Sequence, residues 1–136
     1  MRVCLDTNVL IAAFATRGLC ADVLRTVLAE PDLVIGEVVL AELRRILATK
    51  FKLPPDRIAA IEAVFAPFPV VPKPSKPSDL AIRDAADRWI LATAIAGHAE
   101  VLVTGDRDLL DVNPESPIRI LEPRTFWELL RTEPTD

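Results

Sequence analysis

Acidic residues stand at four places where the surrounding sequence is apolar. Asp6 follows "VCL", Asp106 follows "VLVTG", Glu42 lies within "VVLAELRRIL", and Asp87 precedes "WILATAIA". Burying a carboxylate is unfavourable unless it is paired, hydrogen-bonded or bound to a metal, and like charges held together destabilise a fold unless a cation intervenes. If the four acids converge, their oxygen ligands predict a site for Mg²⁺ or Mn²⁺.

Such a site has a definite chemistry. An ion held by carboxylates, with coordination positions left open, can bind a phosphodiester oxygen, lower the pKa of a water and stabilise a leaving oxyanion. The four acids are therefore candidate catalytic and metal-binding residues, and hydrolysis of a nucleic-acid backbone is the reaction that we expect.

Each acid also has a simpler interpretation. Glu42 can be an ordinary solvated helix residue, and Asp87 can lie near the start of a helix and interact favourably with the helix dipole. Asp106 can cap the short helix "RDLLD", with Gly105 letting the backbone turn. For Asp6 the simpler interpretation is the weakest, because no Lys or Arg adjoins it. The four acids taken together favour the metal site.

Apolar periodicity predicts alternating strands and helices. The strands are expected at 2–6, 33–36, 100–104 and 118–121, and the helices at 7–15, 20–30, 37–50, 54–66, 84–99, 107–111 and 123–132. The cap of the first helix is expected at Thr7 or Asn8. Alternation of this kind predicts an α/β fold with an open, mainly parallel sheet and helices on both faces. Ligands of such sheets bind beyond the carboxyl ends of the strands, where Asp6 and Asp106 are expected.

A proline-rich stretch at 67–78 interrupts this pattern. It is either a stiff linker between domains, or a short edge strand and an extended loop within one domain. A chain of 136 residues matches one domain, so we expect a single domain over 1–136.

Composition excludes several classes of protein. The net charge of −4 does not indicate a basic nucleic-acid-binding surface, although bound divalent cations can reverse the local sign. Cys4, Cys20 and the single His98 are too few for a disulfide framework or a structural zinc site. No apolar window is long enough for a membrane span, and Asp6 and Asn8 interrupt the early apolar run that a signal peptide would need. A cytoplasmic location is therefore expected.

Four motifs together resemble those of PIN-domain ribonucleases. They are "LDTNVLI" at 5–11, the helical Glu42, "DRWILATA" at 87–94 and "LVTGDRDLL" at 102–110, and with their spacing they cover almost the whole chain. Among PIN proteins, the sequence resembles the small bacterial and archaeal members of the VapC group, which are toxins of toxin–antitoxin pairs. The resemblance implies a PIN-like three-layer α/β/α fold and a metal-dependent endoribonuclease that uses Mg²⁺ or Mn²⁺.

The resemblance also implies roles for individual residues. The expected metal ligands are Asp6, Glu42, Asp87 and Asp106, with Asp108 as a further candidate. Supporting roles are expected for Asn8, which could brace Asp6, for Thr104, which could orient an acid or a water, and for Asp84, which could share a helical face with Asp87. Asp111 is expected to be a surface residue.

The sequence indicates the substrate and the partner proteins less clearly than it indicates the metal site. Arg88 and Arg107 adjoin proposed ligands and are predicted to contact phosphate. The basic residues of "RRILATKFK" either complement the helix dipole or contact RNA. Aromatic residues are scarce, so base stacking is expected to add little affinity. The resemblance implies a homodimer and an antitoxin whose peptide occludes the site. The lack of a long apolar window predicts no membrane association.

Other functions remain open at this point. A catalytically silent PIN-like module that binds RNA or protein is the main alternative, and the presence of all four acids weighs against it. DNA is a second possible substrate. An aspartyl phosphatase would need a second Asp at position 8, which is Asn8, and a dinucleotide-binding fold would need glycines in the first turn.

Overall fold

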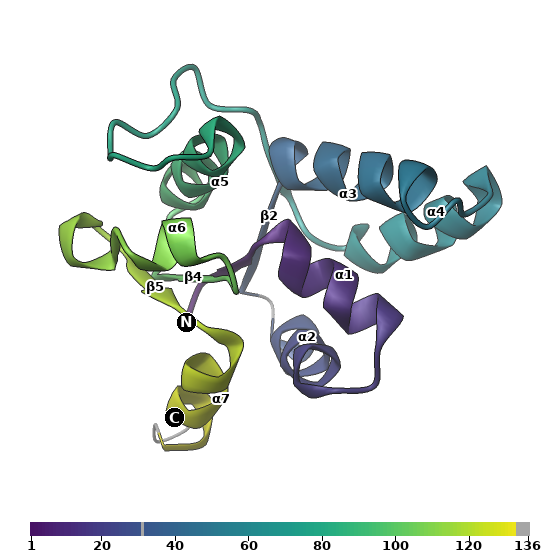
Figure 1. Cartoon of the computed structure of the whole chain (residues 1–136). Coiled ribbons are helices and arrows are strands. Elements are labelled where there is room, and N and C mark those ends of the chain that lie inside the picture. The colour runs from purple at the N-terminus through teal and green to yellow at the C-terminus, as the bar shows by residue number, and fades with distance from the viewer. Residues whose placement is uncertain (31, 133–136) are drawn as a thin grey trace.

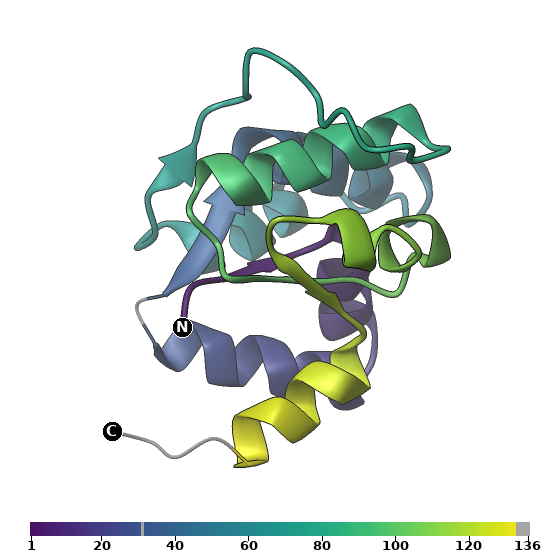
Figure 2. The ribbon, with the colours of Figure 1, turned by 90° about the vertical axis from the view of Figure 1, so that its left-hand side faces the viewer.

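A parallel sheet lies at the centre of the molecule, between two layers of helices (Figures 1 and 2). The computed structural model describes residues 1–30 and 32–132. The strands are β1 (Val3–Leu5), β2 (Leu33–Gly36), β3 (Val70–Val71), β4 (Val101–Val103) and β5 (Arg119–Leu121). Their order is β3-β2-β1-β4-β5, and all four pairings are parallel. The expectation of a three-layer α/β fold with a mainly parallel sheet is confirmed.

Helices cover both faces of this sheet. They are α1 (Thr7–Ala15), α2 (Leu19–Ala29), α3 (Glu37–Thr49), α4 (Pro55–Glu62), α5 (Ala85–Ala96), α6 (Arg107–Leu110) and α7 (Pro123–Thr132), with 3₁₀ turns η1 (Ala63–Phe65) and η2 (Asn113–Glu115). Helices α2 and α7 pack together on one face, and α3 and α5 pack together on the other (Figure 2). Helix α1 contacts both α2 and α3, so it connects the two layers.

Two helices are shorter than expected by more than one residue. The helix predicted over 54–66 ends at Glu62 and continues as η1, and the helix predicted over 84–99 begins after Asp84 and ends at Ala96. The second end has a clear cause, because His98 has a φ of 59°, in the left-handed region that terminates helices.

The proline-rich stretch contributes an edge strand. Val70 and Val71 form β3, which pairs with Ile35 and Gly36 of β2. A proline lacks a backbone N–H and is tolerated at the edge of a sheet, and prolines precede and follow β3. The rest of the stretch is an extended loop, as one of the two interpretations predicted.

The central strands are buried on both faces, which explains their continuous apolar runs. All residues of β1, β2 and β4 are buried, and Cys4 in β1 is a free thiol in the core. In the described ranges, no single helix has the length and hydropathy needed to cross a membrane.

Gly36 lets α5 approach the end of β2 closely. A Cβ atom at this position would collide with the side chain of Thr93, which is fully buried in α5. We therefore expect Gly36→Ala to lower the free energy of unfolding by about 1–3 kcal/mol, because a β-branched neighbour in a packed core cannot move aside. Urea denaturation measures this change.

Gly105 provides the matched control. Contrary to the sequence-based expectation, it does not need glycine's conformational freedom: its φ is not positive, and an added Cβ would meet no atom within 4 Å. Gly105→Ala should change stability by no more than about 0.5 kcal/mol. Equal losses in the two variants would contradict the role given to Gly36.

Candidate functional site

The site lies at the carboxyl edge of the sheet, where β1 and β4 end side by side. Leu5 pairs with Val103, so the next residues, Asp6 and Thr104, become neighbours although 98 positions separate them. The Thr104 hydroxyl donates to Asp6 Oδ2 at 2.7 Å, and the Asp6 backbone N–H donates to the Val103 carbonyl at 2.9 Å. The end of one strand therefore orients the carboxylate at the end of the other.

Asp6 is also the N-cap of α1. Its Oδ1 accepts a hydrogen bond from the Thr7 N–H at 2.7 Å, so the expectation that Thr7 or Asn8 caps this helix is wrong. A residue that leaves a strand with extended backbone angles can cap the following helix without a linking turn. The cap position thus holds the Asp6 carboxylate at the sheet edge.

Burial controls the ionisation of Asp6. The residue is only 3% exposed, and its pKa is raised to about 6, chiefly by burial and also by the nearby charges of Glu42 and Asp106. Its hydrogen bonds with Thr104 and Thr7 act in the opposite direction. A bound cation would counteract both causes, because an opposite charge favours the ionised carboxylate.

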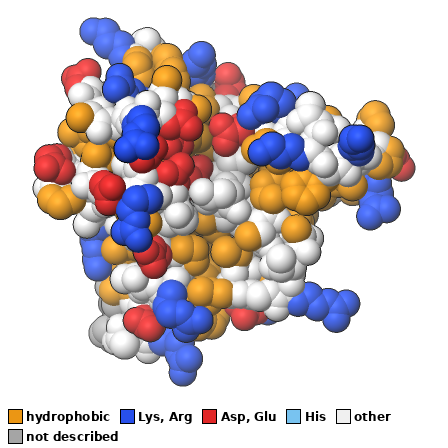
Figure 3. All heavy atoms as spheres, in the orientation of Figure 1, with side chains coloured by type: hydrophobic (Ala, Val, Ile, Leu, Met, Phe, Trp, Pro, Cys, Tyr) orange, Lys and Arg blue, Asp and Glu red, His pale blue; other side chains and the backbone are white. Residues whose placement is uncertain are grey.

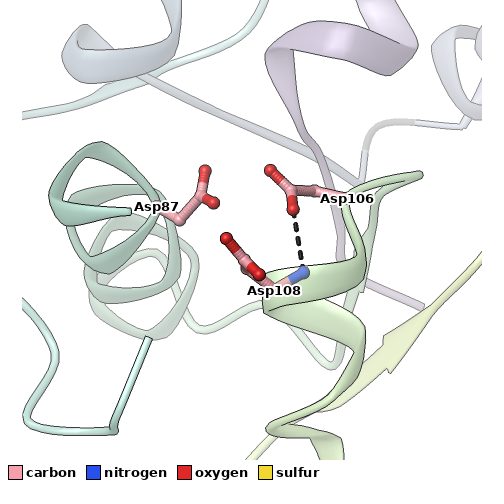
Figure 4. Close-up of side chains that lie close together, drawn as sticks. All are labelled: Asp87, Asp106 and Asp108. Atoms are coloured by element: carbon pink, nitrogen blue, oxygen red, sulfur yellow. Dashed lines mark hydrogen bonds between the residues drawn. The ribbon is translucent and has the colours of Figure 1, made fainter. Parts of the chain in front are cut away.

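Asp106 makes two local hydrogen bonds. Its Oδ1 accepts from the Asp108 N–H at 2.9 Å and caps α6, so the simpler interpretation of this residue is correct. Its own N–H donates to the Thr104 hydroxyl at 2.9 Å, which links Asp106 to Asp6. Figure 4 shows that the Asp106 carboxylate nevertheless faces Asp87 across the site. Capping and metal binding are compatible here because they can use different oxygen atoms.

Asp87 completes a cluster of three carboxylates (Figure 4). It projects from the first turn of α5, and carboxylate oxygens of Asp87, Asp106 and Asp108 lie within 4.8 Å of one another. Asp87 is 7% exposed, and its Oδ2 is buried without a hydrogen-bond partner among the described residues. Burial, followed by the proximity of Asp106, raises the pKa of Asp87 to about 8.

A pocket of about 370 Å³ opens over these acids. It is lined by Asp6, Asn8, Ile11, Glu42, Ile46, Lys50, Phe51, Asp84, Ala86, Asp87 and Asp106. We call it the acid pocket. On the face shown in Figure 3, acidic side chains gather in this region, between the positions of α5, α6 and the start of α3. The structure therefore brings together all four principal acids predicted from the sequence.

The remaining acids of the two motifs occupy different positions. Asp84 lines the acid pocket and caps α5, since its Oδ1 accepts from the Ala86 N–H at 2.9 Å. Asp108 belongs to the cluster of carboxylates although it does not line the acid pocket. Asp111 is exposed at the end of α6, as expected for a surface residue.

The polar and basic candidates make other contacts. Asn8 Oδ1 accepts a long hydrogen bond of 3.5 Å from the Gly105 N–H, so Asn8 connects α1 to the loop after β4. Arg88 Nε donates to the Ile82 carbonyl at 2.8 Å, and Arg107 is exposed at the start of α6. Neither arginine lines the acid pocket.

Five lining residues were not assigned to the site from the sequence: Ile11, Ile46, Lys50, Phe51 and Ala86. Two of them, Lys50 and Phe51, offer a charge and an aromatic ring. Lys50 was predicted only as part of a basic cluster, and Phe51 was not predicted at all, yet both line the acid pocket. The sequence "KFK" at 50–52 could have indicated them, because an aromatic residue between two lysines is a pattern typical of nucleic-acid binding.

The donor set fits a hard divalent cation. All the clustered side chains offer carboxylate oxygens, which are preferred ligands of Mg²⁺ and Mn²⁺. An unpartnered, buried Asp87 oxygen beside two further carboxylates is costly without a cation and favourable with one.

Solved structures with a similar fold support the three-layer α/β/α architecture. FitAcB from Neisseria gonorrhoeae is 19% identical with a TM-score of 0.61, covering 90% of this chain and 98% of that one. VapBC2 from Rickettsia felis, bound to a DNA fragment from its promoter, is 21% identical with a TM-score of 0.62 and the same coverages. A protein from Pyrobaculum aerophilum is 21% identical with a TM-score of 0.62, covering 98% of this chain and 91% of that one. At these identities the likeness concerns the fold alone.

Sequence comparison assigns the family. No curated protein matches the sequence significantly. The family model described as PIN domain matches residues 2–108, which is more than half of the chain and includes the predicted acids at 6, 42, 87, 106 and 108. The chain therefore belongs to the PIN domain family.

Proposed function

We propose that this protein is a metal-dependent endoribonuclease. The observation that carries the proposal is the buried, unpartnered Oδ2 of Asp87, next to the carboxylates of Asp106 and Asp108. Membership of the PIN family supports it, since PIN domains are generally nucleases that use divalent metals. Asp6, Glu42, Asp87 and Asp106 are the proposed metal-binding and catalytic residues, with Asp108 as a further ligand.

The residues of this chain would prepare the reaction in several ways. Asp6 is held by Thr104 and Thr7, so its carboxylate needs little reorganisation when a ligand binds. A bound Mg²⁺ or Mn²⁺ would supply a water of lowered pKa and a positive charge for the phosphodiester oxygens. Lys50, in the wall of the acid pocket, would attract the RNA backbone, and Arg88 and Arg107 remain proposed phosphate contacts.

The test compares wild type with Asp6→Asn on labelled single-stranded RNA. We expect internal cleavage by wild type with Mn²⁺, no cleavage with EDTA, and at least about 100-fold slower cleavage by Asp6→Asn. Equal activity in the two proteins would identify a contaminant and favour a silent PIN-like module. DNA strands of the same sequence are assayed in parallel, and preferential cleavage of DNA would overturn the assignment to RNA.

We further propose that the protein is the toxin of a toxin–antitoxin pair and forms a homodimer. Support comes from its likeness in fold to FitAcB and VapBC2 and from its sequence resemblance to the VapC group. Induced expression in a bacterial host should stop growth for wild type and not for Asp6→Asn, at equal protein levels. Growth arrest by both, or by neither, would contradict the toxin assignment. Analytical ultracentrifugation tests the dimer.

A further inference from the structure

Phe51 is an exposed aromatic residue in a fixed position. Its side chain is 46% exposed, and it is one of three large hydrophobic residues exposed in the described ranges. The backbone around it is held by α3: the Phe51 N–H donates to the Ile46 carbonyl at 3.3 Å, and the Leu53 N–H donates to the Leu47 carbonyl at 3.0 Å. Its exposure is therefore a property of the helix end and not of a loose loop.

Phe51 lines two hollows of the surface, as Ile11 also does. The first is the acid pocket, which Ile46 and Lys50 line as well. The second is an apolar groove of about 430 Å³. The residues of this groove are Ile11, Phe14, Ala15, Leu47, Phe51, Leu53, Arg57, Ala60, Ile61 and Val64. Figure 3 shows hydrophobic side chains between α3 and α1, with basic side chains next to them.

A strand of nucleic acid presents the chemistry that this arrangement can bind. If its phosphodiester reaches the acids, the neighbouring nucleotide must lie on the wall of the acid pocket. Single-stranded bases stack on exposed aromatic rings, and phosphates are attracted to lysine and arginine. Phe51 offers the ring, Lys50 offers a cation in the wall of the acid pocket, and Arg57 offers one in the wall of the apolar groove.

We propose that Phe51 is the stacking platform for a base of single-stranded RNA next to the cleaved phosphodiester, with Lys50 contacting the backbone. The inference rests on the proposed ribonuclease function and adds a substrate-positioning residue to it. The apolar side chains deeper in the groove would equally suit a peptide. The place of Phe51 in the acid-pocket wall together with Lys50, and in the groove wall together with Arg57, favours RNA at this particular residue.

The experiment compares Phe51→Ala, Phe51→Leu and Phe51→Trp by steady-state cleavage of single-stranded RNA with Mn²⁺. Phe51→Ala and Phe51→Leu should raise KM by about 5- to 100-fold and leave kcat within about threefold, because stacking fixes the substrate and not the metal. Phe51→Trp should retain the wild-type KM. Ile95→Ala is the matched control, since Ile95 is also exposed, at 37%, but lines neither hollow.

A second readout does not depend on cleavage. The double variant Asp6→Asn/Phe51→Trp should bind RNA without cleaving it and carries a tryptophan at the proposed stacking position. Added RNA should quench its tryptophan fluorescence more than it quenches that of the Asp6→Asn control, whose only tryptophans are Trp89 and Trp127. The inference would be overturned by a wild-type KM in Phe51→Ala, by a wild-type KM in Phe51→Leu, or by the absence of additional quenching. These results would leave wild-type cleavage intact, whereas failure of the ribonuclease proposal would remove wild-type cleavage itself.

Discussion

Asp106→Asn is expected to slow RNA cleavage by at least about 100-fold while leaving the fold intact. Asn is as good an N-cap as Asp, so the hydrogen bond from the Asp108 N–H that starts α6 can be kept. The substitution removes the negative charge that faces Asp87. Steady-state cleavage rates with Mn²⁺ measure the effect, and circular dichroism checks that α6 and the rest of the fold remain.

The same motif contains the control. Asp111 lies five residues later in "GDRDLLD" but is exposed and lines no part of the acid pocket. Asp111→Asn should therefore keep activity within about twofold of wild type, since surface substitutions away from a site have small effects. Similar losses in the two variants would mean that the acidity of the whole segment matters, and not the specific position of Asp106.

The second large effect concerns stability without metal. The folded-state pKa values of Asp6, about 6, and Asp87, about 8, both lie above their unfolded value of 3.8. The folded state therefore binds more protons than the unfolded state, and stability must fall as the pH rises. The contribution of these groups is complete below about pH 4 and is lost as the pH passes through about 6 and then about 8. We expect Tm in EDTA to fall by at least about 5 °C between pH 5 and 8.5.

Thermal unfolding followed by circular dichroism measures this loss. The scan begins at pH 5 because Glu62, whose pKa is lowered by its hydrogen bond with Arg44, stabilises the fold only while it is ionised. Added Mn²⁺ should raise Tm at pH 8.5, since an ion that binds only the folded state stabilises it. Asp87→Asn should abolish the decline above pH 7 and weaken the response to Mn²⁺. A Tm that is constant or rises between pH 5 and 8.5 would contradict the burial of these charges.

Much of the fold follows from the sequence alone. The apolar runs of β1, β2 and β4 are short and continuous, as expected for strands buried on both faces, and they alternate with helical periods. This pattern predicts a parallel sheet, and in a parallel sheet the ends of the strands lie at one edge. The order of residues is therefore enough to place Asp6 and Asp106 at the same edge of the sheet, because each comes directly after a strand or its turn.

The position of Asp87 and Glu42 was less directly determined. Both lie in helices, where a local pattern shows which residues are apolar but not which neighbouring element a polar side chain faces. Their apolar surroundings made them candidates, and the family resemblance supported their assignment as metal ligands. The packing of α3 against α5, with Gly36 allowing the close approach, is what directs them to the same pocket.

Amino-acid order determined which acids this protein has and that two of them end parallel strands. Tertiary structure decided how each one is used. The pairing of β1 with β4 brings Thr104 to Asp6, the backbone at strand ends makes Asp6 and Asp106 helix caps, and the turn after α3 exposes Phe51 beside the acids. These contacts join residues that are distant in the chain. The hydrogen bonds and the burial of such residues depend on how helices and strands pack together, and local sequence preferences do not determine them.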